Sequence, residues 1–264
     1  MTNLNVFTMK KLIQLVLVVC ICGSCGVDRI YTSGSYGALK SYRAKPAYHE
    51  QNDQATYISA AIKNGKHRQT NPESDDKKTL FTLSAHRAVT KKHWNYYYGL
   101  DLSYGSYRFN EGYLDVVVPD SSSDFFGFTG FGGINYTLSR PKIDYRILGL
   151  EFSYTHEFGS YQDALSVLRN QTASDSNVLV FNRRNLPAFN LYSELLFKLN
   201  RDNSLGIEFY GGEVFVSDPQ LDRSASFAGY ALSYRHKQYT FSLIQEYGQA
   251  DIRSWNVGLS YRLF

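Results

Sequence analysis

The chain has 264 residues and carries 28 Lys and Arg against 24 Asp and Glu, which gives a net charge of +4. This small balance argues against a dedicated nucleic-acid binder, which would concentrate basic residues on one face. No apolar run reaches the roughly 18 residues of a membrane-spanning helix, so a polytopic helical membrane protein is excluded. Phe, Tyr and Trp make up 16% of the chain, which favours β-strands, because aromatic side chains suit a pleated surface.

The N-terminus is typical of a targeting signal. Lys10 and Lys11 precede an apolar stretch that runs from Leu12 to Cys22. That stretch is too short to span a bilayer as a helix and matches the apolar region of a secretory signal peptide. We therefore predict a signal peptide over residues 1–24.

All three cysteines, Cys20, Cys22 and Cys25, lie at the end of this segment. The mature chain therefore has no cysteine pair for a disulfide or a thiolate metal site. Gly23 and Ser24 before Cys25 resemble the lipobox of bacterial lipoproteins, although Cys22 stands where Leu or Val is usual. The resemblance implies cleavage before Cys25 and its acylation with palmitate-type chains, which together anchor a protein stably. The alternative is an ordinary signal peptide with incidental cysteines.

Residues 25–53 are polar and have no sustained period, which predicts a lipidated tether or an irregular plug. From about residue 54 to residue 264 the sequence alternates between apolar and polar residues, as half-buried strands do. Only 162–169 has a helical period, inside a predicted loop. The predicted strands are 54–63, 78–89, 94–109, 126–139, 143–157, 188–199, 204–215, 224–235, 238–248 and 253–264.

The connections between these strands alternate in length. The long ones are 64–77, 110–125, 158–187 and 216–223, and the short ones are 90–93, 140–142, 200–203 and 236–237. This alternation predicts an all-β, antiparallel up-and-down transmembrane barrel of about ten strands over residues 54–264. An even strand number places both barrel ends on the short-turn side, which we expect to be periplasmic and to be where the anchored N-terminus starts.

Each predicted strand has one apolar and one polar face. Along 94–109, Trp94 and Leu100 share the apolar face, whereas Asn95 and Asp101 share the polar one. Three features favour lipid on the apolar side. The polar faces are rich in Gly, Ser, Thr and Asn rather than in Lys and Glu, aromatic residues gather near the strand ends, and the strands are long enough to cross a bilayer at a tilt. The alternative is a soluble, lipid-tethered barrel that binds a small apolar ligand in its core.

The last strand, SWNVGLSYRLF, resembles the C-terminal strand of bacterial outer-membrane barrels, which ends in an aromatic residue and is read by the insertion machinery. Here Phe264 is that residue, although it falls one position out of the usual phase. The resemblance is to the class of small Gram-negative outer-membrane barrels over 54–264, and it names no subfamily of known activity. It implies outer-membrane lipids and the insertion machinery as partners.

Charged residues on the polar strand faces would point into the lumen. We expect a salt-bridged network there, because a buried charge needs a partner; the alternatives are a proton or solute path and a binding site. Ten strands enclose a lumen only slightly wider than the eight-stranded lumen that side chains fill, which argues against a general diffusion pore. The predicted inward set is His86, Asp101, Glu151, Glu194, Lys198, Glu208, Arg235, Glu246 and Arg262.

An outer-rim hydrolase is a second hypothesis, because some outer-membrane barrels are proteases or lipid hydrolases. The candidate residues are His156, Glu157 and Asp124. No Ser–His–acid spacing matches a known motif, so we predict no catalytic residue. The six His residues are scattered without the spacing of zinc ligands, and the sequence predicts no cofactor.

Loop 158–187 contains an apolar patch, Val-Leu-Val-Phe, at 178–181. Loops of this length are usually functional or disordered, and we expect this patch either to hold a partner or to fold into the barrel mouth. The sequence therefore predicts a lipid-anchored outer-membrane barrel with a structural or interaction role. Its extracellular loops would meet an unidentified extracellular or envelope partner.

Overall fold

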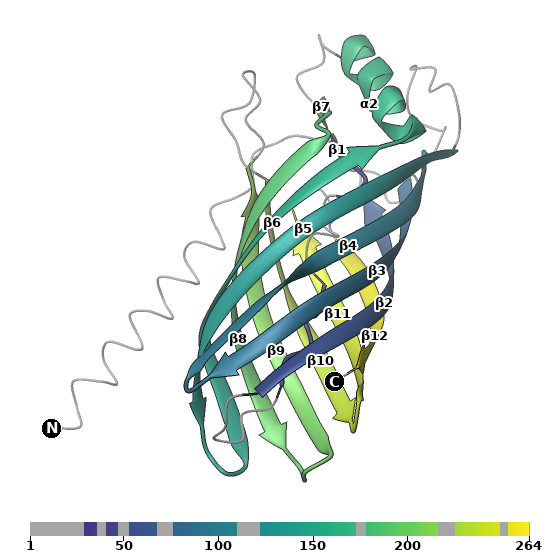
Figure 1. The fold of residues 1–264 in the computed structure, drawn as a ribbon. Coiled ribbons are helices and arrows are strands. Elements are labelled where there is room, and N and C mark those ends of the chain that lie inside the picture. The colour runs from purple at the N-terminus through teal and green to yellow at the C-terminus, as the bar shows by residue number, and fades with distance from the viewer. Residues whose placement is uncertain are drawn as a thin grey trace, which may run out of the picture.

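The computed structural model of the chain describes residues 29–35, 41–46, 53–67, 76–109, 122–172, 178–215, 225–248 and 253–263. Cys25, Phe264 and the predicted signal peptide lie outside these residues. Within the described chain, ten antiparallel strands close into one barrel, and the last strand pairs with the first (Figure 1). The predicted fold class, an up-and-down antiparallel β-barrel, is confirmed.

The observed strands overlap all ten predicted ones, and several are longer. The prediction ended the first strand at Lys63, but it continues to His67, because the inward and outward alternation goes on through polar residues. The barrel strands are β2 (Asp53–His67), β3 (Asp76–Lys91), β4 (Trp94–Arg108), β5 (Ser122–Ser139), β6 (Ile143–Phe158), β8 (Asn185–Lys198), β9 (Asn203–Val214), β10 (Ala225–His236), β11 (Tyr239–Gly248) and β12 (Arg253–Arg262).

The two ends of the barrel differ. At the end we call the short-turn rim, tight connections join β3 to β4, β5 to β6, β8 to β9 and β10 to β11. Two of these turns have a lysine with positive φ, Lys92 at 52° and Lys237 at 53°. We call the opposite end the long-loop rim. Both barrel ends, Asp53 and Arg262, lie at the short-turn rim and form an ion pair of 3.0 Å.

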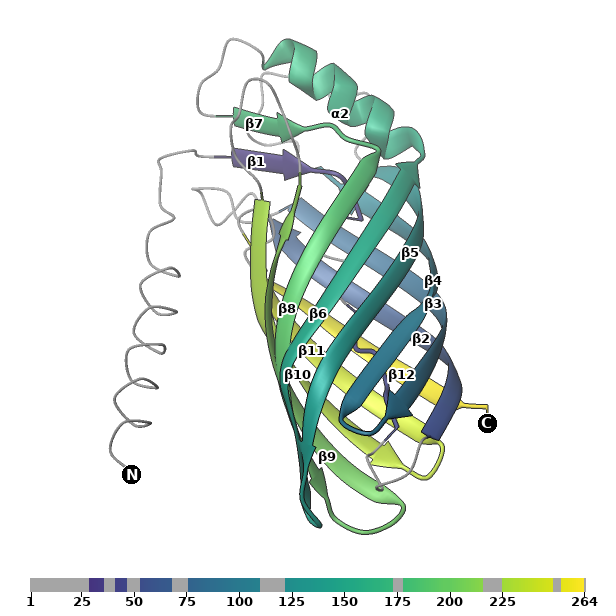
Figure 2. The same ribbon diagram turned by 60° about the vertical axis from the view of Figure 1, so that its left-hand side comes forward.

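The predicted loop 158–187 contains regular structure. It holds α2 (Ser160–Gln171) and β7 (Val178–Phe181), and β7 pairs in parallel with β1 (Arg29–Thr32). Helix α2 includes the helical period seen at 162–169, and Tyr161, Leu165 and Leu168 form its buried face. Figure 2 shows α2, β7 and β1 together at the long-loop rim. We call these three elements the cap.

The described chain ahead of β2 lies partly at the long-loop rim and partly inside the barrel. Ser35 lies at the long-loop rim, where its N–H bonds to Glu157 near the end of β6. Residues 41–46, which we call the strap, lie buried in the lumen, and the Pro46 carbonyl meets Arg146 close to the start of β6. The described residues of this segment thus run from the long-loop rim at Ser35 to a position near the short-turn rim at Pro46. The sequence had placed its start at the short-turn rim instead.

The outside of the described barrel is apolar. Leu100 and Leu102 are half or more exposed, and so are Val257 and Phe209, although side chains of this kind are normally buried. Aromatic residues lie towards both rims: Trp94 packs edge-on against Tyr136 near the short turns, whereas Phe126 stacks on Phe158 near the long loops. Across the described residues, no helix is long and apolar enough to span a membrane.

Candidate functional site: the strap inside the lumen

Arg43 is the central residue of the strap. Its guanidinium donates to both carboxylate oxygens of Asp101, at 2.9 and 2.7 Å, and to Ser84 at 3.2 Å. Glu151 lies 3.9 Å from its Nε atom, and the guanidinium carbon sits 3.5 Å from the centre of the Phe131 ring. A bidentate, charge-assisted pair of this kind fixes the orientation of the side chain as well as its position.

Lys45 lies between two acidic residues of neighbouring strands. Its ammonium group is 3.6 Å from Glu194 and 3.5 Å from Glu208. It also lies 4.4 Å from the centre of the Tyr192 ring and 5.2 Å from that of Tyr97, within the range of cation–π attraction. The strap thus supplies positive charge to acids on four strands of the lumen wall: Arg43 faces β4 and β6, and Lys45 faces β8 and β9.

Three more contacts fix the strap. The Tyr42 hydroxyl donates to Glu194 at 2.8 Å, and Arg146 donates to the Pro46 carbonyl at 3.0 Å. The same Arg146 holds Glu194 at 2.5 Å. The His86 ring nitrogen Nε2 lies 2.8 Å from the Ala44 carbonyl oxygen. Both the backbone and the side chains of the strap are therefore matched to the wall.

The electrostatics of the strap follow from these neighbours. The guanidinium of Arg43 lies against the carboxylates of Asp101 and Glu151, and these opposite charges offset the cost of burying the cation. The buried Tyr42 hydroxyl keeps its hydrogen-bonding partner because it donates to Glu194.

The predicted inward set omitted three bases that meet its acids. It contained five acids but only three bases, because it was drawn from the strands alone. The strap residues Arg43 and Lys45, together with Arg146 on β6, meet four of those acids. Sequence reasoning missed all three bases. The polarity of residues 26–53 was visible, but nothing in it indicated that two of its charges are buried.

The remaining predicted lumen residues lie nearer the rims. Lys198 bonds to Asp144 at 2.8 Å, and Glu246 accepts from Lys63 at 2.7 Å. Arg262 pairs with Asp53 and is partly exposed at the short-turn rim. In the described part of the protein, the Nε and Nη2 atoms of Arg235 are buried without a hydrogen-bond partner. The nine residues therefore do not converge on one centre.

Glycines on the wall make room for the lumen aromatics. A Cβ atom on Gly133 would collide with the Tyr97 ring, and one on Gly149 would collide with the Tyr192 ring. The Tyr97 hydroxyl donates to Glu151 at 2.8 Å, which holds the ring in place. The absence of a side chain at these two glycines therefore leaves room in the lumen for the Tyr97 and Tyr192 rings.

The cap packs at the long-loop rim beside β5 and β6, with an apolar layer next to a buried acid. The Glu157 carboxylate accepts the N–H groups of Gly34 at 3.0 Å and Ser35 at 2.5 Å, and the side chain of Gln162 also donates to it. Above it, Tyr161 stacks on Tyr107 with ring centres 4.6 Å apart. Val178 and Val180 belong to the same buried cluster as Tyr107 and Tyr161, and Phe181 belongs to the lumen cluster. The apolar patch of 178–181 therefore folds into the barrel mouth, one of the two outcomes expected from the sequence.

The candidate hydrolase residues do not meet. His156 and Asp124 are exposed, whereas Glu157 is buried on the inner face. His156 bonds instead to Asn185 at 2.8 Å. No group of three His, Cys, Asp or Glu residues within the described chain is arranged to hold a metal ion. The residues that the sequence offered for rim catalysis therefore form no shared site.

No protein-family model matches the sequence, and no curated protein is significantly similar to it. Solved structures with a similar overall shape include an outer-membrane channel from Pseudomonas putida F1 (8% identity, 84% of this chain and 100% of that chain, TM-score 0.47). The β domain of the Bordetella autotransporter BrkA is another (12% identity, 78% and 99% covered, TM-score 0.48). Neisserial surface protein A is a third (10% identity, 78% and 95% covered, TM-score 0.33).

Proposed function

We propose that this protein is a closed, non-enzymatic barrel of the bacterial outer membrane with a structural or interaction role at its long-loop rim. The observation that carries the proposal is the filled lumen: Arg43 and Lys45 of the strap are buried in ion pairs with the wall. A lumen held shut by several buried, charge-assisted contacts favours a display scaffold over an open pore.

The apolar exterior supports the membrane location. Soluble monomers rarely expose apolar patches above a few hundred Å², yet here Leu, Val, Ile and aromatic residues cover the outward faces of neighbouring strands. A closed barrel also pairs its backbone groups between strands, as hydrocarbon requires. A soluble barrel with an apolar ligand in its core would need the reverse arrangement, whereas this interior is lined by polar and charged side chains.

Single-channel recording in planar bilayers tests the closed lumen. We expect the purified protein to insert without steady conductance. We expect the double variant Arg43→Ala with Lys45→Ala to show cation-selective openings, because the wall acids Asp101, Glu194 and Glu208 then lose the positive charges that hold the strap. The control variant Lys91→Ala with Lys142→Ala removes the same charge from exposed positions at the short-turn rim and should stay silent. Steady conductance of the unaltered protein would contradict the proposal.

We propose, as the sequence suggested, that Cys25 carries a lipid anchor. Cys25 precedes Arg29 by four residues, which span at most about 14 Å when extended. Because Arg29 begins β1 in the cap, the acyl chains would enter the leaflet nearest the long-loop rim. The mass of the mature protein tests this proposal. An unmodified N-terminus at another residue would contradict it.

A further inference from the structure

The short-turn rim of the barrel is strongly basic. Its four connections, 92–93, 140–142, 199–202 and 237–238, hold five cations and a single acid. The last residue of β3 adds a sixth cation at the same rim. We call these residues the cationic ring: Lys91, Lys92, Arg140, Lys142, Arg201 and Lys237. All six side chains are exposed, and each of the four turns contributes at least one of them.

The opposite rim has the reverse balance of charge. Its connections together hold five cations and ten acids in the sequence, and they are 68–75, 109–121, 159–184, 215–224 and 249–252. This count includes every acid of the long connections. The connections at the two ends of the barrel therefore carry opposite net charges.

The charge of the cationic ring exceeds what the protein can neutralise at that rim. Among the described residues, none of the six side chains forms an ion pair. Two other acids near this rim, Asp53 and Asp144, are paired with bases of the barrel. The segment 47–52 lies outside the described residues and holds one acid, Glu50. Even with Glu50 and the turn residue Asp202 counted, the six cations outnumber the acids three to one.

The cationic ring stands just beyond aromatic side chains of the outer wall. Lys91 lies opposite Trp94 on the neighbouring strand, and Lys237 comes two residues before Tyr239. Both aromatic side chains are more than 40% exposed. Trp and Tyr concentrate at the two membrane–water interfaces. In a membrane, the cations would therefore lie in the layer of lipid headgroups.

Arg87 extends the positive charge onto the outer wall itself. It lies on β3, four residues before Lys91, and its exposed side chain donates to Gln54 at 2.7 Å. An arginine on the lipid-facing side is costly at the membrane midplane and much less so near the headgroups, which its long side chain can reach. A lipid headgroup can meet Arg87 at this position, whereas a soluble acidic protein would be kept away by the surrounding bilayer.

We propose that the cationic ring and Arg87 bind anionic glycerophospholipids, of the phosphatidylglycerol class, in the leaflet at the short-turn rim. Each Lys or Arg near a membrane surface adds attraction to anionic lipids. Cations spread over all four turns suit several lipids around the barrel better than one compact ligand. The proposal rests on the proposed function, since it needs the barrel to span a membrane.

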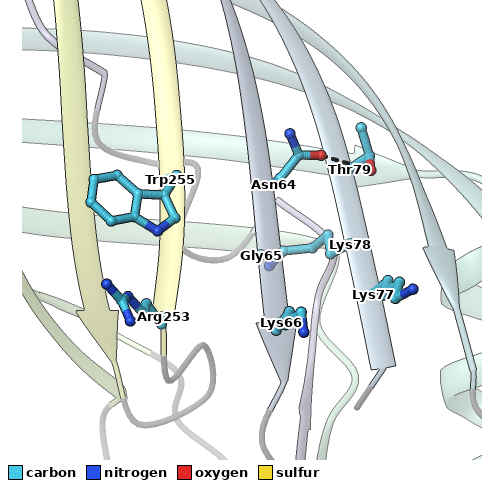
Figure 3. Close-up of a pocket in the computed structure, with 8 residues that line it drawn as sticks. All are labelled: Asn64, Gly65, Lys66, Lys77, Lys78, Thr79, Arg253 and Trp255. Carbon is cyan, nitrogen blue, oxygen red and sulfur yellow. Dashed lines mark hydrogen bonds between the residues drawn. The ribbon is translucent and has the colours of Figure 1, made fainter.

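The two tryptophans of the chain allow the two rims to be tested separately. Trp94 adjoins the cationic ring, whereas Trp255 lies two residues from Arg253, towards the long-loop end of β12 (Figure 3). The variants Trp255→Phe and Trp94→Phe each keep one of them. Lipids with brominated acyl chains quench tryptophan fluorescence on contact. Quenching by brominated phosphatidylglycerol, compared with brominated phosphatidylcholine, therefore measures which lipid surrounds each tryptophan of the full protein in mixed vesicles.

We expect Trp94 to show a roughly threefold preference for phosphatidylglycerol, because several cations stand beside it. Trp255 should show no preference. In the protein that keeps only Trp94, the triple variant Lys91→Gln, Arg140→Gln, Lys142→Gln should lose the preference. Inorganic phosphate should leave the preference of the parent unchanged, because a free anion lacks the acyl chains that hold a lipid against the wall.

The matched variant Lys66→Gln, Lys77→Gln, Arg253→Gln loses three exposed cations from the long-loop rim, and it should keep the preference at Trp94. Equal preference at Trp94 and Trp255, or equal loss in both triple variants, would overturn the proposal. Displacement by inorganic phosphate would overturn the choice of a lipid. No preference at Trp94 would also refute lipid binding and leave an acidic protein as the partner. If the protein inserts into no vesicle, the proposed membrane function is wrong instead.

Discussion

Arg43 shows how one side chain can fix the position of a buried segment inside the barrel. It is almost fully buried, and so are both carboxylates that face it, Asp101 and Glu151. The net stability of a buried ion pair is small, because both partners lose their hydration, but removing one partner leaves an uncompensated charge. The pair therefore specifies where the strap lies more than it adds to the total stability.

We expect Arg43→Met to lower the free energy of unfolding by about 3 kcal/mol or more, since Asp101 would remain buried without its partner. Adding Asp101→Leu to that variant should recover most of the loss, because the stranded carboxylate is then gone. Urea unfolding followed by Trp fluorescence measures both. If the double variant is as unstable as the single one, the pair does not act as described.

Two neighbouring glycines allow a test of the packed lumen. Gly133 faces inward against the Tyr97 ring, whereas a Cβ on Gly132 would meet only the Tyr97 carbonyl oxygen, at an ordinary 3.7 Å. We expect Gly133→Ala to cost about 1–3 kcal/mol through overpacking. Gly132→Ala should be close to neutral. Equal effects of the two substitutions in the same unfolding assay would mean that the Tyr97 ring does not require a glycine at position 133.

At the scale of single elements, α2 depends on the residue before it. The backbone of Gly159 has φ 128° and ψ 174°, a conformation that residues other than glycine rarely adopt. A Cβ there would also collide with the Asp124 carbonyl oxygen. The sharp turn from β6 into α2 is therefore open to glycine alone.

We expect Gly159→Ala to loosen the cap and leave the barrel intact, because the barrel strands do not depend on α2 for their pairing. Limited proteolysis should then cut within 160–171 at least several-fold faster than in the parent protein. The folded band in gels should persist at the parent's temperature. A drop in that temperature without faster cleavage would mean that the turn supports the barrel rather than the cap.

The barrel strands were predictable from sequence because each has one face in contact with an apolar phase. The period of two is therefore strong wherever the outward residues are Leu or aromatic. It fades at the long-loop ends, where Asn64 and Lys66 take the outward positions of β2, and the prediction stopped there. Strand β1 was not predicted, because four residues that pair only with the distant β7 leave no periodic signal.

The lumen could be predicted only in part, for a reason that belongs to the whole molecule. The alternation of side chains along each strand predicted which acids point inward. Glu194 and Glu208 are two of them, and both are buried. Their partner Lys45, however, lies in a non-periodic segment, and its position depends on contacts with strands more than a hundred residues away. The position of Lys45 follows from the charges of the closed barrel wall around it. A local sequence pattern carries no information about those distant charges.

The path of the strap makes a prediction about sidedness. An epitope inserted just before Arg29 should be labelled from the same side of the membrane as one inserted within 110–121, because both positions adjoin the long-loop rim. An epitope in the turn at 140–142 should be labelled from the opposite side. Antibody labelling of intact and permeabilised cells distinguishes them. Labelling of the first position together with the turn would mean that the chain does not pass through the barrel.

A ring that encloses its own leading segment restricts the order of assembly. The seam between β2 and β12 is the only place where strands distant in sequence join the wall of the described barrel, so it is the natural last joint. Residues 41–46 bond to strands on both sides of the lumen. They must therefore be in place inside the partly formed sheet before β2 pairs with β12. Otherwise the segment would have to pass through a lumen that side chains already fill.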